Sequence, residues 1–175
     1  MFIKLTISIV LLATTFCVAS DEEAPFMGYQ ELTTKLKAEY VKSGMYASTE
    51  QVKKALKSED WVVVDVRNSN EWSAAYIEGT KRVGRKNPEK LIKNFCLDFA
   101  DDFTRNKVIV VCNSAARASI VAETFKTMGF KKVMIYDIYA WIDECNPISN
   151  DYTIMSSSKG TGLKFGTFKA AHCKK

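Results

Sequence analysis

A cysteine and an arginine separated by four residues, Cys112 and Arg117, are the side chains best suited to chemistry in this chain. An apolar, β-branched run precedes the cysteine at residues 108–111, and an apolar helical period follows the arginine. This order predicts a buried strand, a tight loop and the first turn of a helix. Helix dipole, loop amides and guanidinium all favour a thiolate there. The pattern therefore predicts nucleophilic sulfur chemistry, the alternative being a cysteine that only packs in the core.

The elements around this loop predict an α/β domain with a parallel sheet flanked by helices. Continuous apolar runs are typical of strands that are buried on both faces, and helical patterns alternate with them. Strands are expected at residues 61–66, 107–111 and 133–136. Helices are expected at residues 29–42, 52–56, 69–76, 88–100 and 117–128, with a short helix or turn at 139–141.

The chain of 175 residues divides by composition into four parts. Residues 1–20 have one early lysine, a short apolar stretch and small residues before an acidic run, which is typical of a signal peptide. Residues 21–45 are expected to form a helical extension, 46–146 the main domain, and 147–175 an irregular tail. We therefore expect an exported protein, with an uncleaved anchor as the alternative.

The composition limits the partners and cofactors. A net charge of +5 is mildly basic, and the basic residues are dispersed along the chain. This argues against nucleic-acid binding and suits a small anionic substrate. The chain has one histidine, and its cysteine spacings do not resemble a zinc site. No metal or other cofactor is expected.

The cysteines outside the predicted signal peptide are Cys96, Cys112, Cys145 and Cys173. An oxidising compartment invites pairing, but the sequence does not give the connectivity. If Cys112 is a nucleophile it has to be free, and a bridge between Cys145 and Cys173 is then the natural remaining pair. Cys96 is expected to pack in the interior.

Two separated motifs resemble a single rhodanese domain over residues 46–145. The first is Val64-Asp65-Val66-Arg67…Glu71-Trp72…Tyr76-Ile77-Glu78-Gly79, and the second is Cys112-x4-Arg117…Gly129-Phe130…Val133…Trp141. The resemblance implies a parallel sheet with the nucleophile loop at the carboxyl end of a strand. In departure from the family pattern, Tyr76 stands in place of the usual histidine and Ala115 in place of a frequent loop glycine.

The run Cys112-Asn-Ser-Ala-Ala-Arg117-Ala is most similar to the loop of exported polysulfide–sulfur transferases. The resemblance implies that Arg67, Arg85 and Arg117 hold an anionic sulfur chain, and it suggests a homodimer in the bacterial periplasm. Arg67 follows a predicted strand, and its alternative role is to tie Glu71 to the loop. We expect the loop residues Asn113, Ser114, Ala115 and Ala116 to bind substrate through inward-pointing amides.

The expected reaction is nucleophilic catalysis in two steps. Cys112 takes sulfane sulfur from polysulfide or thiosulfate as a persulfide and passes it to a thiol, cyanide or protein acceptor. Two other functions stay open. One is a phosphatase or arsenate reductase, whose usual cysteine–arginine loop is one residue longer than this one. The other is a non-catalytic rhodanese-like binding module.

Overall fold

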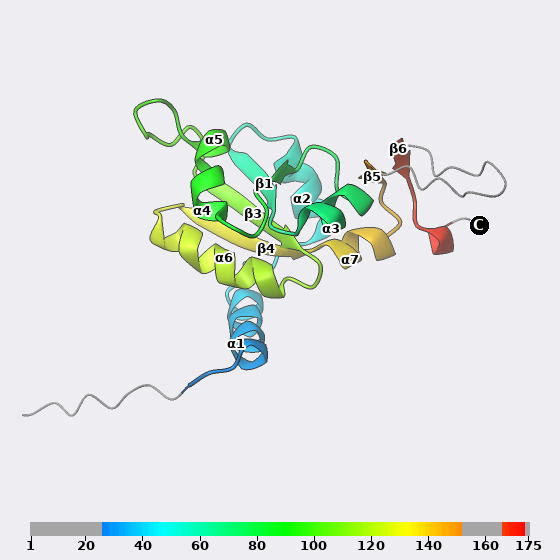
Figure 1. The fold of residues 1–175 in the computed structure, drawn as a ribbon, viewed down its shortest axis with the longest axis horizontal. Helices are drawn as coiled ribbons and strands as arrows, with labels where there is room; N and C mark the ends of the chain where they lie inside the picture. Colours follow the sequence, from blue (N-terminus) through cyan, green and yellow to red (C-terminus); the bar gives the residue numbers. More distant parts are fainter. Residues whose placement is uncertain (1–25, 152–165, 174–175) are drawn as a thin grey trace, which may run out of the picture.

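The computed structural model describes residues 26–151 and 166–173, so the predicted signal peptide lies outside the described residues. A parallel four-stranded sheet with the order β2-β1-β3-β4 forms the centre of the domain, and helices cover it (Figure 1). The expected α/β class with a parallel sheet is confirmed. Within the described residues, no helix combines the length and the apolar character needed to cross a membrane.

The sheet brings the carboxyl ends of its strands to one edge. The strands are β1 (Trp61–Asp65), β2 (Lys81–Arg82), β3 (Lys107–Cys112) and β4 (Lys132–Asp137). In their register Asp65 lies opposite Val111, and Cys112 lies opposite Asp137. The segment that follows β1 and the loop that follows β3 are therefore neighbours. The sequence predicted β1, β3 and β4, but it missed β2, which has only two residues, both exposed and charged.

Two apolar clusters lie on opposite faces of the sheet. One joins alternate residues of β1 and β3, among them Val64 and Val110, to α1 (Tyr29–Lys42), α5 (Lys93–Cys96), α6 (Ala116–Thr127) and the residue between α4 (Pro88–Leu91) and α5, Ile92. The other joins the residues between them, such as Val63 and Ile109, to α2 (Thr49–Leu56) and α7 (Ile138–Asp143). Because successive side chains of a strand enter opposite clusters, both faces of the strand are buried, and its sequence is a continuous apolar run.

The segment between α1 and α2 extends the sheet at its β4 edge. Tyr46 forms a parallel bridge with Ile135. The amide of Ala47 donates to the Ile135 carbonyl at 2.8 Å, and the amide of Ile135 donates to the Met45 carbonyl at 3.0 Å. The N-terminal helical extension is thus joined to the domain by backbone hydrogen bonds.

The single helix expected at residues 88–100 is wrong. The structure has two short helices, α4 and α5, and the backbone is extended at Leu97. The Asp98 carboxylate then accepts from the amides of Ala100 and Asp102 at 2.9 and 3.0 Å. An aspartate that takes up backbone amides in this way favours a turn over a helix. The neighbouring Phe99 is fully exposed.

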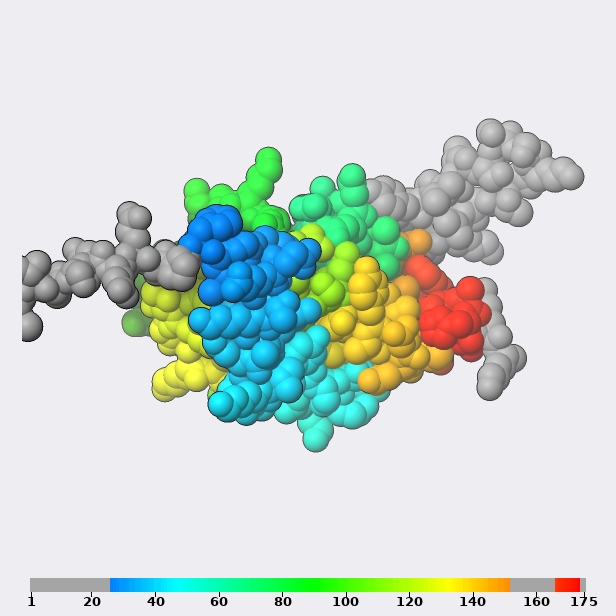
Figure 2. Space-filling view, turned by 90° about the horizontal axis from the view of Figure 1, so that it is seen from below, coloured from blue at the N-terminus to red at the C-terminus, as the bar shows by residue number. Residues whose placement is uncertain are grey.

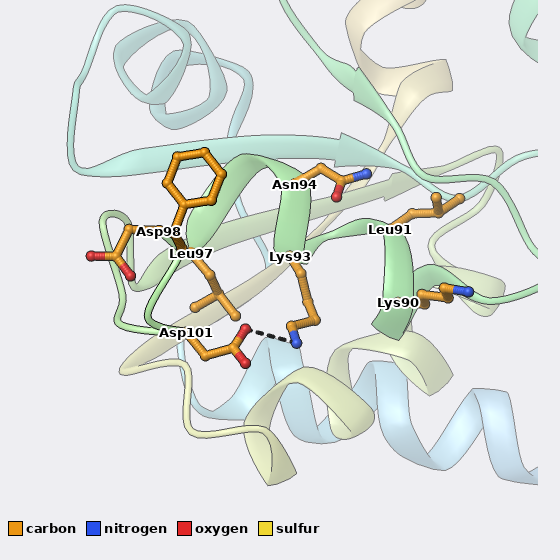
Figure 3. A pocket seen from close by; sticks show the side chains of 8 residues that line it. Lys90, Leu91, Lys93, Asn94, Leu97, Asp98 and Asp101 are labelled. Carbon is orange, nitrogen blue, oxygen red and sulfur yellow. Dashed lines mark ion pairs between the residues drawn. The ribbon is translucent and has the colours of Figure 1, made fainter.

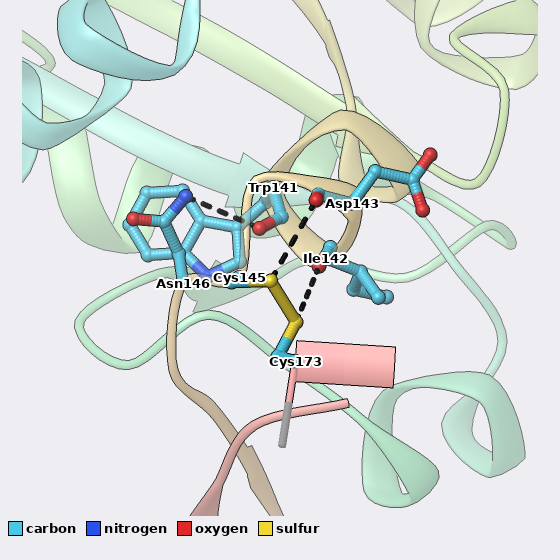
Figure 4. Close-up of a disulfide and its surroundings, with 6 residues drawn as sticks. All are labelled: Trp141, Ile142, Asp143, Cys145, Asn146 and Cys173. Carbon is cyan, nitrogen blue, oxygen red and sulfur yellow. Dashed lines mark hydrogen bonds between the residues drawn. A yellow bond between two sulfur atoms is a disulfide. The ribbon is translucent and has the colours of Figure 1, made fainter. Parts of the chain in front are cut away.

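The described part of the tail is more regular than expected. Strands β5 (Ile148–Asn150) and β6 (Gly166–Phe168) form an antiparallel pair, and a 3-10 turn, η1 (Ala171–Cys173), follows. A disulfide joins Cys145 to Cys173 with a Cα–Cα distance of 5.5 Å (Figure 4). The disulfide therefore holds Cys173 beside the end of α7, and Figure 2 shows the red C-terminal segment next to the orange one.

Candidate functional site

The sulfur of Cys112 lies beneath the turn that joins β3 to α6. The side chain is free and 1% exposed, and its Sγ accepts a hydrogen bond from the amide of Ala118 at 3.4 Å. Ala115 precedes the helix in the left-handed conformation, with φ of 58°. An alanine thus adopts the backbone conformation that a glycine adopts more readily.

The turn leaves a set of amides around the sulfur. Within the described part of the chain, the backbone N–H groups of residues 114–117 donate to no other group. The first amides of a helix have no partner inside it, and together with the helix dipole they stabilise an anion. Ser114, Ala115 and Ala116 are therefore placed to stabilise negative charge through their backbone amides.

Arg117 does not point into open space. Its Nη1 and Nη2 donate to the two carboxylate oxygens of Glu71 at 2.6 Å each. The side chains are 17% and 28% exposed. These hydrogen bonds raise the pKa of Arg117 above its ordinary value, and the nearby charge of a Cys112 thiolate acts in the same direction. The arginine that follows the nucleophile is thus already paired with a carboxylate.

Glu71 is held in place by further donors. The Asn113 amide nitrogen donates to its Oε1 at 2.7 Å, and the backbone amide of Asn68 donates to its Oε2 at 3.0 Å. The hydrogen bonds from Arg117 are the main reason that the pKa of Glu71 falls to about 2. Asn113 therefore holds Glu71 through its side chain, a role that the sequence did not predict.

Arg67 supports the site from within. It is 3% exposed, and its Nε and Nη2 donate to the Asp65 carboxylate at 2.7–3.1 Å. Nη2 also donates to the Ala75 carbonyl at 2.6 Å, and Nη1 reaches the Glu71 carbonyl at 3.3 Å and the Asn113 side chain at 3.5 Å. Burial raises the pKa of Asp65, and the hydrogen bonds from Arg67 oppose that rise. Of the two roles left open by the sequence, the geometry thus favours the structural one over the substrate contact that the resemblance implied.

Arg85 lies in the basic loop that follows β2. Together with Lys86 it lines a groove of about 200 Å³, in which Arg117 and residues of α6 form the other wall. A second hollow of about 530 Å³ adjoins this groove through Arg85 and Lys86, and Arg82 also lines it. The basic loop at residues 82–86 therefore lies beside Arg117 at the start of α6.

Glu71 is the main residue of the site that the sequence reasoning missed. It belongs to the first of the two quoted motifs, but the sequence indicated it only as a partner for Arg67. Its pairing with Arg117 joins residues 46 positions apart. One signal was available, since a carboxylate that follows one strand and an arginine that follows the neighbouring strand meet at the same sheet edge.

Two other places could hold a small group. A hollow of about 650 Å³ beside α4 and α5 includes the Lys93–Asp101 ion pair of 2.8 Å, but no residue of the 112–117 loop lines it (Figure 3). The ligand atoms of Cys145, His172 and Cys173 lie within 4.8 Å of one another. The two sulfurs are bonded to each other, whereas a metal requires thiolates.

Comparisons with known proteins place this geometry in a family. A sequence profile of the rhodanese-like domain matches residues 48–143. The chain is 33% identical over 92 residues to a tRNA uridine(34) hydroxylase of Streptococcus pyogenes serotype M12 (strain MGAS2096), covering 50% of this chain and 28% of that protein. The corresponding protein of Streptococcus agalactiae serotype III (strain NEM316) is 32% identical over 91 residues, covering 52% and 27%. The chain spans little more than a quarter of these relatives.

Solved structures show the same fold. The polysulfide-sulfur transferase homodimer from Wolinella succinogenes is similar with a TM-score of 0.52 and 24% identity, over 73% of this chain and 91% of that chain. The Alr3790 protein from Anabaena sp. is similar with a TM-score of 0.50 and 14% identity, over 59% and 91%. At these identities the likeness concerns the fold. The family profile covers more than half of the chain, and the chain therefore belongs to the rhodanese-like domain family.

Proposed function

We propose that this protein is a sulfurtransferase in which Cys112 carries sulfur as a persulfide. The observation that carries the proposal is the free Cys112 at the end of β3, surrounded by the unpaired amides of the loop and close to Arg117. A thiolate in such a setting has stabilisation for its own charge and for the charge on a transferred sulfur.

The reaction has two displacement steps that balance without an outside oxidant or reductant. In the first, the Cys112 thiolate attacks the terminal sulfane sulfur of the donor. A sulfur–sulfur bond forms to Cys112 as the donor's own sulfur–sulfur bond breaks, and sulfite or a shortened polysulfide leaves with the electron pair. In the second, a thiolate, cyanide or protein acceptor attacks the outer sulfur and releases the Cys112 thiolate.

The basic loop supports an anionic donor, and polysulfide suits it because a longer anion can contact Arg117 and the neighbouring cations together. Arg85 and Lys86 lie in the groove that Arg117 also lines. The structural relative from Wolinella succinogenes is named a polysulfide-sulfur transferase and a homodimer. By analogy we propose a polysulfide or thiosulfate donor and a homodimer, and from the predicted signal peptide an exported, periplasmic protein.

Intact-protein mass spectrometry of the reduced protein tests this proposal. After treatment with polysulfide or thiosulfate, we expect a gain of one or more sulfur atoms that peptide mapping places on Cys112. Cyanide should remove this sulfur, and Cys112→Ser should not acquire it. A matched Cys96→Ser control should load normally, because Cys96 lies in the core and burial raises the pKa of its thiol to about 12.

The opposite result is equally informative. If neither donor adds sulfur although Cys112 is shown to be a free thiol, the sulfurtransferase proposal fails and a rhodanese-like binding module is the better account. In that case, the Cys112→Ser protein should keep the biological effect of the wild type.

A further inference from the structure

The cation next to the nucleophile is neutralised by the protein's own carboxylate. Glu71 takes both terminal nitrogens of Arg117 at 2.6 Å, and Asn113 and Asn68 hold the carboxylate from its other sides. A bidentate pair of this kind is geometrically specific and is among the stronger hydrogen-bonded contacts in proteins. An anionic donor that uses Arg117 must therefore replace Glu71.

The other arginine close to the loop offers no substitute. Arg67 is buried, and its guanidinium donates to Asp65, to backbone carbonyls and to Asn113. Arg85 and Lys86 form no ion pair within the described residues, and they lie in the groove that also contains Arg117. A donor can gain from them only if it extends beyond the loop.

An intramolecular carboxylate is a strong competitor for a small anion. It is held at its partner by the fold, so its effective concentration is high, in the millimolar range or above. A short anion such as thiosulfate would exchange one ion pair for another of the same kind. A longer dianion would replace the carboxylate at Arg117 and at the same time contact the cations of the groove.

We propose that Glu71 is a specificity-determining residue that occupies the anion position at Arg117, so that the site excludes short anions and admits long anionic donors that also reach Arg85 and Lys86. The inference rests on the proposed function for its biological meaning. The effect of Glu71 on the access of anions to Cys112 does not depend on the proposed function, and it can be measured without sulfur transfer.

The first test compares alkylation of Cys112 by iodoacetate and iodoacetamide, which are similar in size and differ in charge. In the wild type the Glu71–Arg117 pair is neutral overall, so it neither attracts nor repels the negative charge of iodoacetate strongly. Charge should therefore contribute little to the ratio of the two alkylation rates. In Glu71→Gln the guanidinium is free, and we expect the ratio of the iodoacetate rate to the iodoacetamide rate to rise about tenfold at low salt. The rise should shrink as salt screens the charge.

The controls separate this effect from a general disturbance. Glu50→Gln also removes a carboxylate that pairs with a basic side chain, Lys53, but at an exposed position on α2, and it should leave the ratio unchanged. Glu71→Asp keeps the charge on a shorter side chain and should give an intermediate ratio. Mass spectrometry of peptides counts only the label on Cys112. If Glu71→Gln does not fold, Glu71→Asp is the deciding variant. An alkylation ratio in Glu71→Asp equal to that of the wild type would then overturn the proposal.

The second test measures sulfur transfer from donors of different length. Glu71→Gln should lower KM for thiosulfate about tenfold, and KM for polysulfide by clearly less, with kcat changed little. If the wild type transfers sulfur but the variant changes neither the KM values nor the alkylation ratio, the role of Glu71 is disproved and the proposed function stands. If no donor transfers sulfur but the alkylation ratio rises, Glu71 shields Cys112 in a protein with another function.

Discussion

Arg67 donates to both carboxylate oxygens of Asp65, two residues before it in the chain, and the two side chains are almost completely buried. The pair connects the end of β1 to α3 (Ser69–Ala74), because the same guanidinium reaches the carbonyls of Glu71 and Ala75. The position of Glu71 therefore depends on Arg67, although no hydrogen bond among the described residues joins Arg67 to Cys112 or Arg117.

Removal of Arg67 should destabilise the protein strongly. Arg67→Ala leaves the buried Asp65 carboxylate without its partner, and we expect a loss of about 3–5 kcal/mol in the free energy of unfolding. Urea denaturation measures this loss. Arg82→Ala, on the exposed strand β2, is the matched control and should change the stability by less than about 0.5 kcal/mol. Similar stabilities of the two variants would contradict the structural role of Arg67.

The backbone at Ala115 should tolerate glycine and reject a β-branched residue. Its φ is 58° and its side chain is fully buried. Ala115→Gly relieves the strain of the left-handed conformation, but it removes a buried methyl group and makes the unfolded chain more flexible. Because these effects oppose one another, we expect the free energy of unfolding to change by no more than about 1 kcal/mol. Ala115→Val should cost about 2–4 kcal/mol, because it adds strain and bulk. Thermal unfolding and Cys112 alkylation provide the readout, and a valine variant that matches the wild type in both refutes this view of the turn.

The Glu71–Arg117 pair should make stability depend on pH in the acid range. The pKa of Glu71 in the folded protein is about 2, below its ordinary value of 4.5. Its carboxylate therefore contributes stability above about pH 4.5, and this contribution is lost as the pH falls towards 2. Since the pair is partly exposed, we expect Glu71→Gln to be less stable than the wild type by on the order of 1–2 kcal/mol at pH 7. Denaturation at a series of pH values should show this difference shrinking towards pH 2. A difference that is constant or grows with acidity would be inconsistent with it.

The disulfide should stabilise the C-terminal segment. Cys145 and Cys173 are 28 residues apart, and the loss of a cross-link over a loop of this length costs about 2–4 kcal/mol. We expect the double variant Cys145→Ser/Cys173→Ser to unfold earlier in urea and to lose residues 166–173 to protease first. Under reducing conditions the wild type should behave as the variant does. Equal protease resistance of the oxidised wild type and the variant would show that other contacts hold this segment.

Local patterns predicted the main elements well. The apolar runs of β1, β3 and β4 and the periods of α1 and α6 are long enough to be recognised without tertiary context. The split of residues 88–100 depends on a side-chain contact of Asp98, and β2 exists only because it pairs with β1. Such elements have weak signals of their own.

The site was predicted less completely than the fold. Cys112 and Arg117 are close in sequence, so a motif identifies both. Glu71 reaches Arg117, and Asn113 reaches Glu71, only after two neighbouring strands have paired. The sequence shows which residues lie near the sheet edge, but the direction of a flexible arginine depends on which carboxylate the fold brings to it.

The bridge between Tyr46 and Ile135 has a consequence for solubility. An uncovered edge strand invites pairing with another chain, and β4 is an apolar edge. The segment before α2 covers part of that edge, and α1 packs its buried Tyr40 against the domain. A chain cut just before residue 48, where the family match begins, would expose this strand and aggregate, even though every residue of the nucleophile loop would still be present.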